Sequence, residues 1–121
     1  MWRLVVAGFL VLHGILNAAI WIPPQRGSEL PNFGPQASWL FAEVRPVVVT
    51  LAVIAAGGFA LSGVAYLVHL DMWAFSAIIA AVVSIALIVA TFTPWWSFAV
   101  VINAVILYAA WQPATAQLAG R

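Results

Sequence analysis

Charge is the property this sequence has least of. Only 6% of its 121 residues are charged, with four basic residues against three acidic ones. Soluble domains carry charge at about a quarter of their positions. A chain this poor in charge could not cover a water-exposed surface, so lipid must be the solvent for most of it. The net charge of +1 supplies no basic patch, which argues against a nucleic-acid partner.

Cysteine is absent altogether. Its absence excludes disulfides, thiolate catalysis, iron–sulfur clusters and cysteine-ligated zinc. The sequence also contains no Ser/His/Asp set, no paired carboxylates within an apolar segment and no glycine-rich phosphate loop. We therefore predict no catalytic residues, and the sequence favours a protein that is not an enzyme.

Long apolar runs are abundant: 66% of the residues are hydrophobic and the mean hydropathy is +1.12. Four segments, at about 4–22, 46–70, 72–92 and 94–111, approach the ~20 residues that a membrane-spanning helix needs. A polar loop over 23–45 joins the first two. The sequence predicts one all-α transmembrane domain over 1–121, an integral membrane four-helix bundle of up-down topology, with the lipid bilayer as its surroundings.

Prolines and small residues set the expected boundaries and contacts. Pro23 ends the first segment and Pro113 is expected to end the fourth. Gly58 and Ser62 form a small-xxx-small pair, which predicts close packing of the second and third segments as an antiparallel hairpin. The first segment also permits a signal-peptide interpretation with cleavage near Asn17, but its length favours a retained span.

Two polar residues interrupt the first apolar segment. His13 lies near its middle, and Asn17 lies one helical turn further on the same face. Polar side chains at that depth must face protein, because lipid cannot satisfy them. Asn103 lies midway along the fourth segment, so the three predict a ligand pocket between neighbouring helices. Tyr66 and Ser62 are further candidates, followed by Ser84 and Thr50.

Two interpretations of this pocket stay open. His13 could donate to a backbone carbonyl or to Asn103 as an interhelical contact worth about 1 kcal/mol. Alternatively, the neutral pocket would suit a small polar or quinone-like ligand rather than an ion. Haem is disfavoured because ligation by two histidines needs both at a similar depth in the membrane. His13 lies near the centre of its segment, whereas His69 lies roughly 18 Å along the axis from the centre of its own. No metal site is expected either, because His13 has no second ligand nearby.

The loop over 23–45 supplies a candidate entrance. Trp39 belongs to a short apolar stretch that suits the membrane interface. Glu43 and Arg45 follow it, directly before the second segment. If the stretch folds back over the bundle, these three residues would guard an opening; otherwise the loop is a plain connector.

The arginines are divided equally between the two sides of the membrane, so the positive-inside rule gives a tie. Arg3 and Arg121 share one side of a four-span chain, while Arg26 and Arg45 share the other. We predict a multi-pass protein of the bacterial inner membrane with both termini in the cytoplasm.

Several short motifs resemble one group of proteins. Arg3, the run Leu12-His13-Gly14, Asn17 and Asn103 resemble small bacterial four-span membrane proteins of DoxX-like type, as does the tryptophan-rich turn at 95–96. The resemblance implies a compact bundle, sometimes a partner subunit of quinone or sulfur redox systems. Many relatives carry a second histidine where this chain has Asn17, which puts haem or metal binding further in doubt.

Three functions fit these observations. The first is a non-catalytic accessory subunit or small-ligand-binding bundle of a membrane complex, with a protein partner or a second copy. The second is a quinone- or redox-associated protein that binds its ligand at His13, Asn17 and Asn103. The third is a small oligomeric transporter or channel, since four helices alone rarely enclose a pore.

Overall fold

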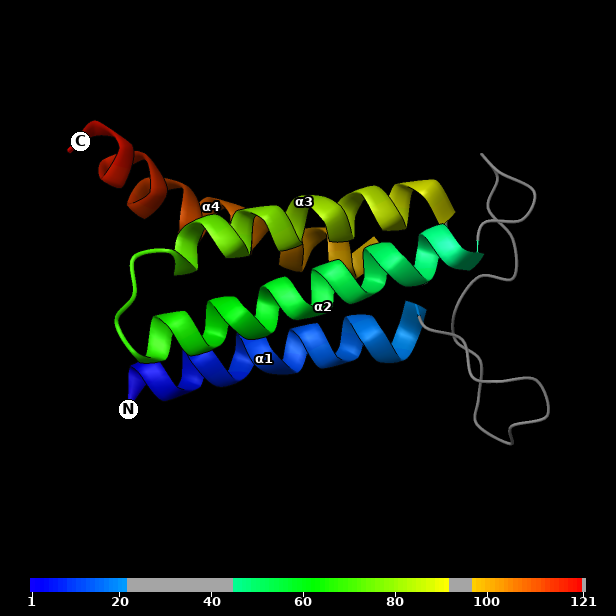
Figure 1. Ribbon diagram of the computed structural model, residues 1–121, viewed down its shortest axis with the longest axis horizontal. Coiled ribbons are helices and arrows are strands. Elements are labelled where there is room, and N and C mark those ends of the chain that lie inside the picture. The colour runs from blue at the N-terminus through cyan, green and yellow to red at the C-terminus, as the bar shows by residue number, and fades with distance from the viewer. Residues whose placement is uncertain (22–44, 92–96, 121) are drawn as a thin grey trace.

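Four helices account for nearly all of the chain that can be described. The computed structural model describes residues 1–21, 45–91 and 97–120. The helices are α1 (Trp2–Trp21), α2 (Arg45–Leu67), α3 (Trp73–Thr91) and α4 (Ser97–Ala119), and these ranges contain no strand. Consecutive helices run in opposite directions, so both ends of the chain lie at the same end of the molecule (Figure 1). The predicted all-α, up-down architecture is confirmed.

The distribution of side chains is that of a protein in lipid. All four helices are long and apolar enough to cross a membrane. Large aliphatic side chains such as Ile79 and Val105 point outward, with about 60% of their surface exposed. The centre is built from small residues, and Ala55, Ala77 and Ala80 are completely buried. Because lipid is as apolar as leucine, helices gain more from close contact through small residues than from burying large ones. The chain is therefore a multi-pass membrane protein.

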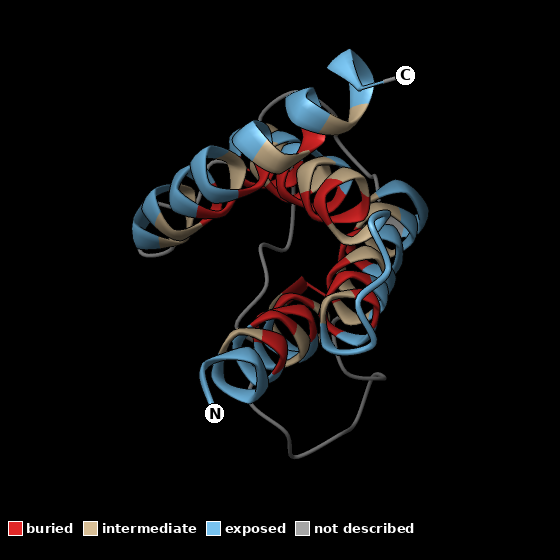
Figure 2. Ribbon diagram, turned by 90° about the vertical axis from the view of Figure 1, so that its left-hand side faces the viewer, coloured by how far each residue is buried: buried red, intermediate tan, exposed pale blue. Residues whose placement is uncertain are grey.

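The helices form an open arc rather than a closed ring. Extensive packing joins α1 to α2, α2 to α3 and α3 to α4. Viewed along the bundle, the buried residues line the inner side of this arc, and α1 and α4 form its two ends (Figure 2). The described parts of α1 and α4 therefore pack against each other less extensively than the three pairs of consecutive helices do.

Glycines mark the closest helix crossings. A Cβ atom added at Gly58 would lie 2.9 Å from the Ala80 Cβ, so α2 and α3 do approach as the small-residue pattern predicted. Two further close contacts, both between α1 and α2, were not predicted. A Cβ at Gly14 would lie 2.8 Å from the carbonyl oxygen of Ala56, and one at Gly63 would lie 2.8 Å from that of Ala7. Glycine at these two positions lets α1 and α2 meet backbone to backbone.

The expected end of the fourth helix is wrong. Pro113 lies inside α4, which continues to Ala119. A proline within a helix removes one backbone hydrogen bond but does not have to stop the helix. The residues that follow are mostly good helix formers, and Ala114 is buried in the core cluster. The Thr115 hydroxyl also donates to the carbonyl of Trp111 at 3.0 Å, which ties the turn around Pro113 together.

A tight turn at 68–72 connects α2 to α3. His69 adopts a left-handed conformation with φ of 64°. The Leu70 amide donates to the Ala65 carbonyl at 2.8 Å and the His69 amide to that of Tyr66 at 3.4 Å, which is the pattern of a Schellman C-cap. The second helix therefore ends at Leu67, three residues before the predicted end at 70. His69 stands where glycine is usual, at the membrane end and far from His13.

Candidate functional site

Four buried polar side chains form a closed hydrogen-bond circuit in the middle of the molecule. His13 Nε2 lies 3.2 Å from Asn103 Oδ1, and Asn103 Nδ2 donates to Ser84 Oγ at 3.0 Å. Ser84 Oγ donates to Asn17 Oδ1 at 2.8 Å, and Asn17 Nδ2 donates to the backbone carbonyl of His13 at 3.1 Å. All four residues are buried. The circuit thus connects α1, α3 and α4 within the apolar interior.

The direction of every hydrogen bond follows from one backbone group. The His13 carbonyl can only accept, so Asn17 must turn its NH₂ toward it and its Oδ1 toward Ser84. Ser84 then donates to Asn17 and accepts from the NH₂ of Asn103. Asn103 consequently turns its Oδ1 toward His13, whose Nε2 must carry the hydrogen. The circuit thus requires a hydrogen on Nε2, and in the neutral imidazole this leaves Nδ1 as an acceptor.

Two aromatic rings hold the imidazole in place. Phe9 stacks parallel to His13 with ring centroids 6.0 Å apart and an interplanar angle of 8°. Phe59, which is fully buried, meets the ring edge-on at 4.7 Å and 73°. These contacts come from α1 itself and from α2. The orientation of His13 is therefore set by three neighbours: Phe9, Phe59 and Asn103.

A cleft of about 270 Å³ lies beside the circuit, between α1 and α4. His13 and Asn17 supply its polar groups, and the other seven lining residues are apolar. The apolar lining consists of Leu16, Ala19, Ile20, Trp21, Phe98, Ala99 and Ile102. The cleft therefore combines one polar wall with an otherwise apolar interior.

The polar wall retains unused hydrogen-bonding capacity. Asn17 Nδ2 carries two hydrogens, and among the described residues only the His13 carbonyl accepts one of them. His13 Nδ1 likewise has no partner within the described ranges. Both residues are more than nine-tenths buried, so water does not readily satisfy them. Two residues that line the cleft thus retain one donor and one acceptor without a partner among the described residues.

The structure brings together three of the five predicted pocket residues, His13, Asn17 and Asn103. It does not bring Ser62 and Tyr66 to them. Ser62 donates to the Trp73 carbonyl at 2.8 Å and so ties α2 to the start of α3. Tyr66 packs edge-on against Trp73 at 4.9 Å, near the end of α2. Both residues stabilise the turn between α2 and α3 instead of lining the cleft.

The predicted entrance falls outside the part of the chain that is described. Trp39 and Glu43 lie outside the described residues. Arg45 is the first residue of α2, and its side chain is not described.

Ser84 and Trp21 are the residues whose importance sequence reasoning underestimated. Ser84 ranked only as a secondary candidate, yet it both accepts from Asn103 and donates to Asn17. Its position four residues after Ala80 is typical of small-residue helix packing, which does not reveal a hydrogen-bonding role. Tryptophans near helix ends commonly lie at the membrane interface, but Trp21 is 3% exposed and lines the cleft. No pattern in the sequence distinguishes a buried tryptophan at a helix end from an interfacial one.

The fold and the circuit together define a class: a multi-pass membrane protein of four helices with a neutral polar centre. No group of three or more metal-ligating side chains comes together within 1–21, 45–91 and 97–120. Comparisons with protein-family models, with curated proteins and with solved structures found no match for this chain.

Proposed function

We propose that this protein binds a small, membrane-dissolved molecule with an apolar body and a hydrogen-bonding head, of the quinone type, in the cleft between α1 and α4. The observation that carries the proposal is the combination of an apolar cleft with a free donor on Asn17 and a free acceptor on His13. An unsatisfied polar group in an apolar environment costs about 1–3 kcal/mol. A head group that satisfies both atoms recovers that free energy.

The chemistry of the two free atoms favours a particular head group. A carbonyl oxygen can accept from the Asn17 N–H, and a hydroxyl can also donate to His13 Nδ1. A quinol hydroxyl can do both, whereas the oxidised quinone has a carbonyl oxygen that accepts from Asn17 but no hydrogen to donate to His13. The cleft volume of about 270 Å³ suits a single ring, since sites for drug-sized ligands begin near ~300 Å³. An attached tail would extend through the opening between α1 and α4 into lipid.

Fluorescence quenching tests the proposal directly. A decyl-substituted benzoquinone is titrated into the purified protein in mild detergent while tryptophan emission is recorded. Trp21 lines the cleft, so we expect a saturable quenching component that disappears in Trp21→Phe. Asn17→Leu removes the free donor and should raise the Kd about tenfold, equivalent to ~1.4 kcal/mol. Ala19→Leu fills the cleft from an exposed position, and should abolish saturable binding without disturbing the fold.

Ser62→Ala is the matched control, because it removes a buried hydroxyl that lies outside the cleft. Its Kd should stay within about twofold of the wild type, a difference below ~0.5 kcal/mol. Circular dichroism verifies that each variant remains folded. The proposal is wrong if quenching is not saturable, or if Ser62→Ala weakens binding as much as Asn17→Leu.

The remaining sequence predictions concern the resemblance to other proteins, the partners and the location of the protein. The DoxX-like resemblance agrees with a quinone-related role, and it rests on the motifs around His13 and Asn103. The accessory-subunit and transporter functions each need a partner chain or a second copy. The bacterial inner membrane is what the resemblance implies, and the even number of spans places both termini on one side, for which we propose the cytoplasm.

A further inference from the structure

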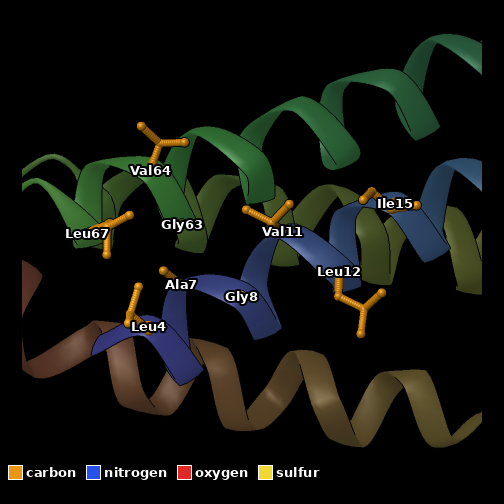
Figure 3. Close-up of a pocket in the computed structure, with 9 residues that line it drawn as sticks. All are labelled: Leu4, Ala7, Gly8, Val11, Leu12, Ile15, Gly63, Val64 and Leu67. Atoms are coloured by element: carbon orange, nitrogen blue, oxygen red, sulfur yellow. The ribbon is translucent and has the colours of Figure 1, made fainter. Parts of the chain in front are cut away.

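A second depression lies on the opposite, α2-facing side of α1. It is a groove of about 350 Å³ on the outer surface between α1 and α2 (Figure 3). All nine lining residues are apolar: Leu4, Ala7, Gly8, Val11, Leu12, Ile15, Gly63, Val64 and Leu67. Its floor is the backbone contact between Gly63 and Ala7, where a Cβ would lie 2.8 Å from the carbonyl oxygen. The groove is therefore shaped by helix packing rather than by loose side chains.

Gly8 lines the groove on the α1 side and has no side chain to occupy it. A Cβ added at Gly8 would meet nothing within 4 Å. Helix packing therefore does not require glycine at this position, unlike at Gly14 and Gly63. Glycine in an exposed helix interior costs about 1 kcal/mol relative to alanine. The open space at Gly8 is the feature that lets an elongated molecule lie against α1.

The length of the groove matches one leaflet of a bilayer. From Leu4 to Ile15 it follows α1 for about 16 Å at ~1.5 Å per residue. Half of the ~30 Å hydrocarbon core is about 15 Å. The groove thus starts at the membrane end of α1 and stops near the bilayer midplane, which is the path of one acyl chain.

A cation lies at the membrane end of this path. Arg3 directly precedes Leu4, the first lining residue, and its guanidinium carbon lies 5.6 Å from the centre of the Tyr66 ring. Tyr66 in turn directly precedes Leu67, the last lining residue. No carboxylate pairs with Arg3 in the described part of the chain, so the guanidinium can bind an anion. Guanidinium groups bind phosphate oxygens in a bidentate geometry.

We infer that this groove is a binding site for one anionic phospholipid, with an acyl chain along α1 and the phosphate on Arg3. The apolar lining, the one-leaflet length and the unpaired cation at its outer end all fit that single occupant. A second copy of the chain would cover the apolar lining but would bring no anion to Arg3 from its own apolar spans. The site is separate from the α1/α4 cleft and does not depend on the function proposed for it.

Native mass spectrometry of the full chain released from vesicles of equimolar phosphatidylglycerol and phosphatidylcholine tests this site. We expect the wild type to retain one phosphatidylglycerol in about fivefold preference, the factor equivalent to ~1 kcal/mol for one cation near an anionic lipid. Arg3→Gln should retain the two lipids equally. Gly8→Leu fills the groove and should reduce lipid retention of either kind by at least half.

Gly57→Leu is the matched control, because a Cβ at Gly57 also meets nothing within 4 Å but the residue lies outside the groove. It should behave as the wild type. Equal retention of both lipids by the wild type would overturn the inference, as would a Gly57→Leu variant that loses as much lipid as Gly8→Leu. A Gly8→Leu variant that keeps its lipid but loses a dimer mass would assign the groove to a second copy instead.

Discussion

Ser84 illustrates how a small side chain acquires a large role at the residue scale. Its hydroxyl is both the acceptor for Asn103 and the donor to Asn17, so it connects α4 to α1 through α3. All the hydrogen bonds of the circuit point the same way around it, from donor to acceptor. Hydrogen bonds arranged in this way strengthen one another. Removing the hydroxyl leaves two amide groups with an unsatisfied atom in the interior. The circuit should therefore respond to single substitutions more strongly than isolated bonds do.

The first prediction at this scale concerns Ser84→Ala. We expect it to lower the free energy of unfolding by about 1–2 kcal/mol, since buried hydrogen bonds in membrane proteins contribute ~0.6 and at most ~1.7 kcal/mol each. Unfolding in mixed micelles with increasing SDS measures the change. Ser76→Ala is the control, because Ser76 is buried in the same helix but bonds only to local carbonyls of Met72 and Trp73. A loss in Ser76→Ala equal to that in Ser84→Ala would contradict a special role for the circuit.

At the scale of the element, α1 carries glycines of two kinds. Gly14 is pressed against α2, where an added Cβ would lie 2.8 Å from the Ala56 carbonyl oxygen and 3.1 Å from the Phe59 Cβ. Gly8, six residues earlier on the same helix, faces open space. Helix propensity treats the two alike, whereas helix packing requires only the first.

Alanine substitutions separate these two contributions. Gly14→Ala should lower the free energy of unfolding by about 1–3 kcal/mol, because the methyl group forces α1 and α2 apart. Gly8→Ala should leave stability unchanged or raise it by up to ~1 kcal/mol through helix propensity. The same SDS titration, performed on both variants side by side, gives the comparison. If both variants lose stability equally, the α1/α2 crossing is not where the structure places it.

At the scale of the whole molecule, the arc of helices depends on a polar link between its ends. Packing joins each helix to its neighbour in sequence, and α1 and α4 lie at the two ends of the arc (Figure 2). Residues of both helices line the cleft. The His13–Asn103 hydrogen bond connects these two helices at the inner end of the cleft. The width of the opening should therefore depend on that bond.

The distance between two spin labels, one on α1 and one on α4, measured by double electron–electron resonance, tests this dependence. The sequence contains no cysteine, so two cysteines introduced at Leu12 and Val105 would be the only sites that react with a spin label. Both positions are exposed. We expect Asn103→Leu to lengthen the distance by about 2 Å or more, the scale of helix shifts, and to broaden its distribution. Ser62→Ala should leave the distance unchanged, since that hydroxyl bonds elsewhere. An unchanged distance in Asn103→Leu would mean that α2 and α3 alone hold the arc in place.

The pattern of apolar and polar residues is enough to predict the class of this protein and the burial of its central polar residues. Four apolar runs near the length of a bilayer can fold only as helices, because lipid offers no partner for backbone groups. For the same reason His13, Asn17 and Asn103 had to face protein, and all three are buried. These conclusions follow from solvation, which acts on each residue according to its own chemistry.

Which polar groups meet, and where space remains between the helices, depends instead on how the helices pack. Ser84 joined the circuit while Ser62 bonded to the α2–α3 turn, although both lie in apolar segments beside small residues. Pro113 stayed helical because Ala114 packs into the core. Helix rotation and crossing angle decide such outcomes, and they result from many weak contacts between helices distant in sequence. The α1/α4 cleft and the α1/α2 groove exist for the same reason, as spaces left over when glycine and alanine draw the helices together.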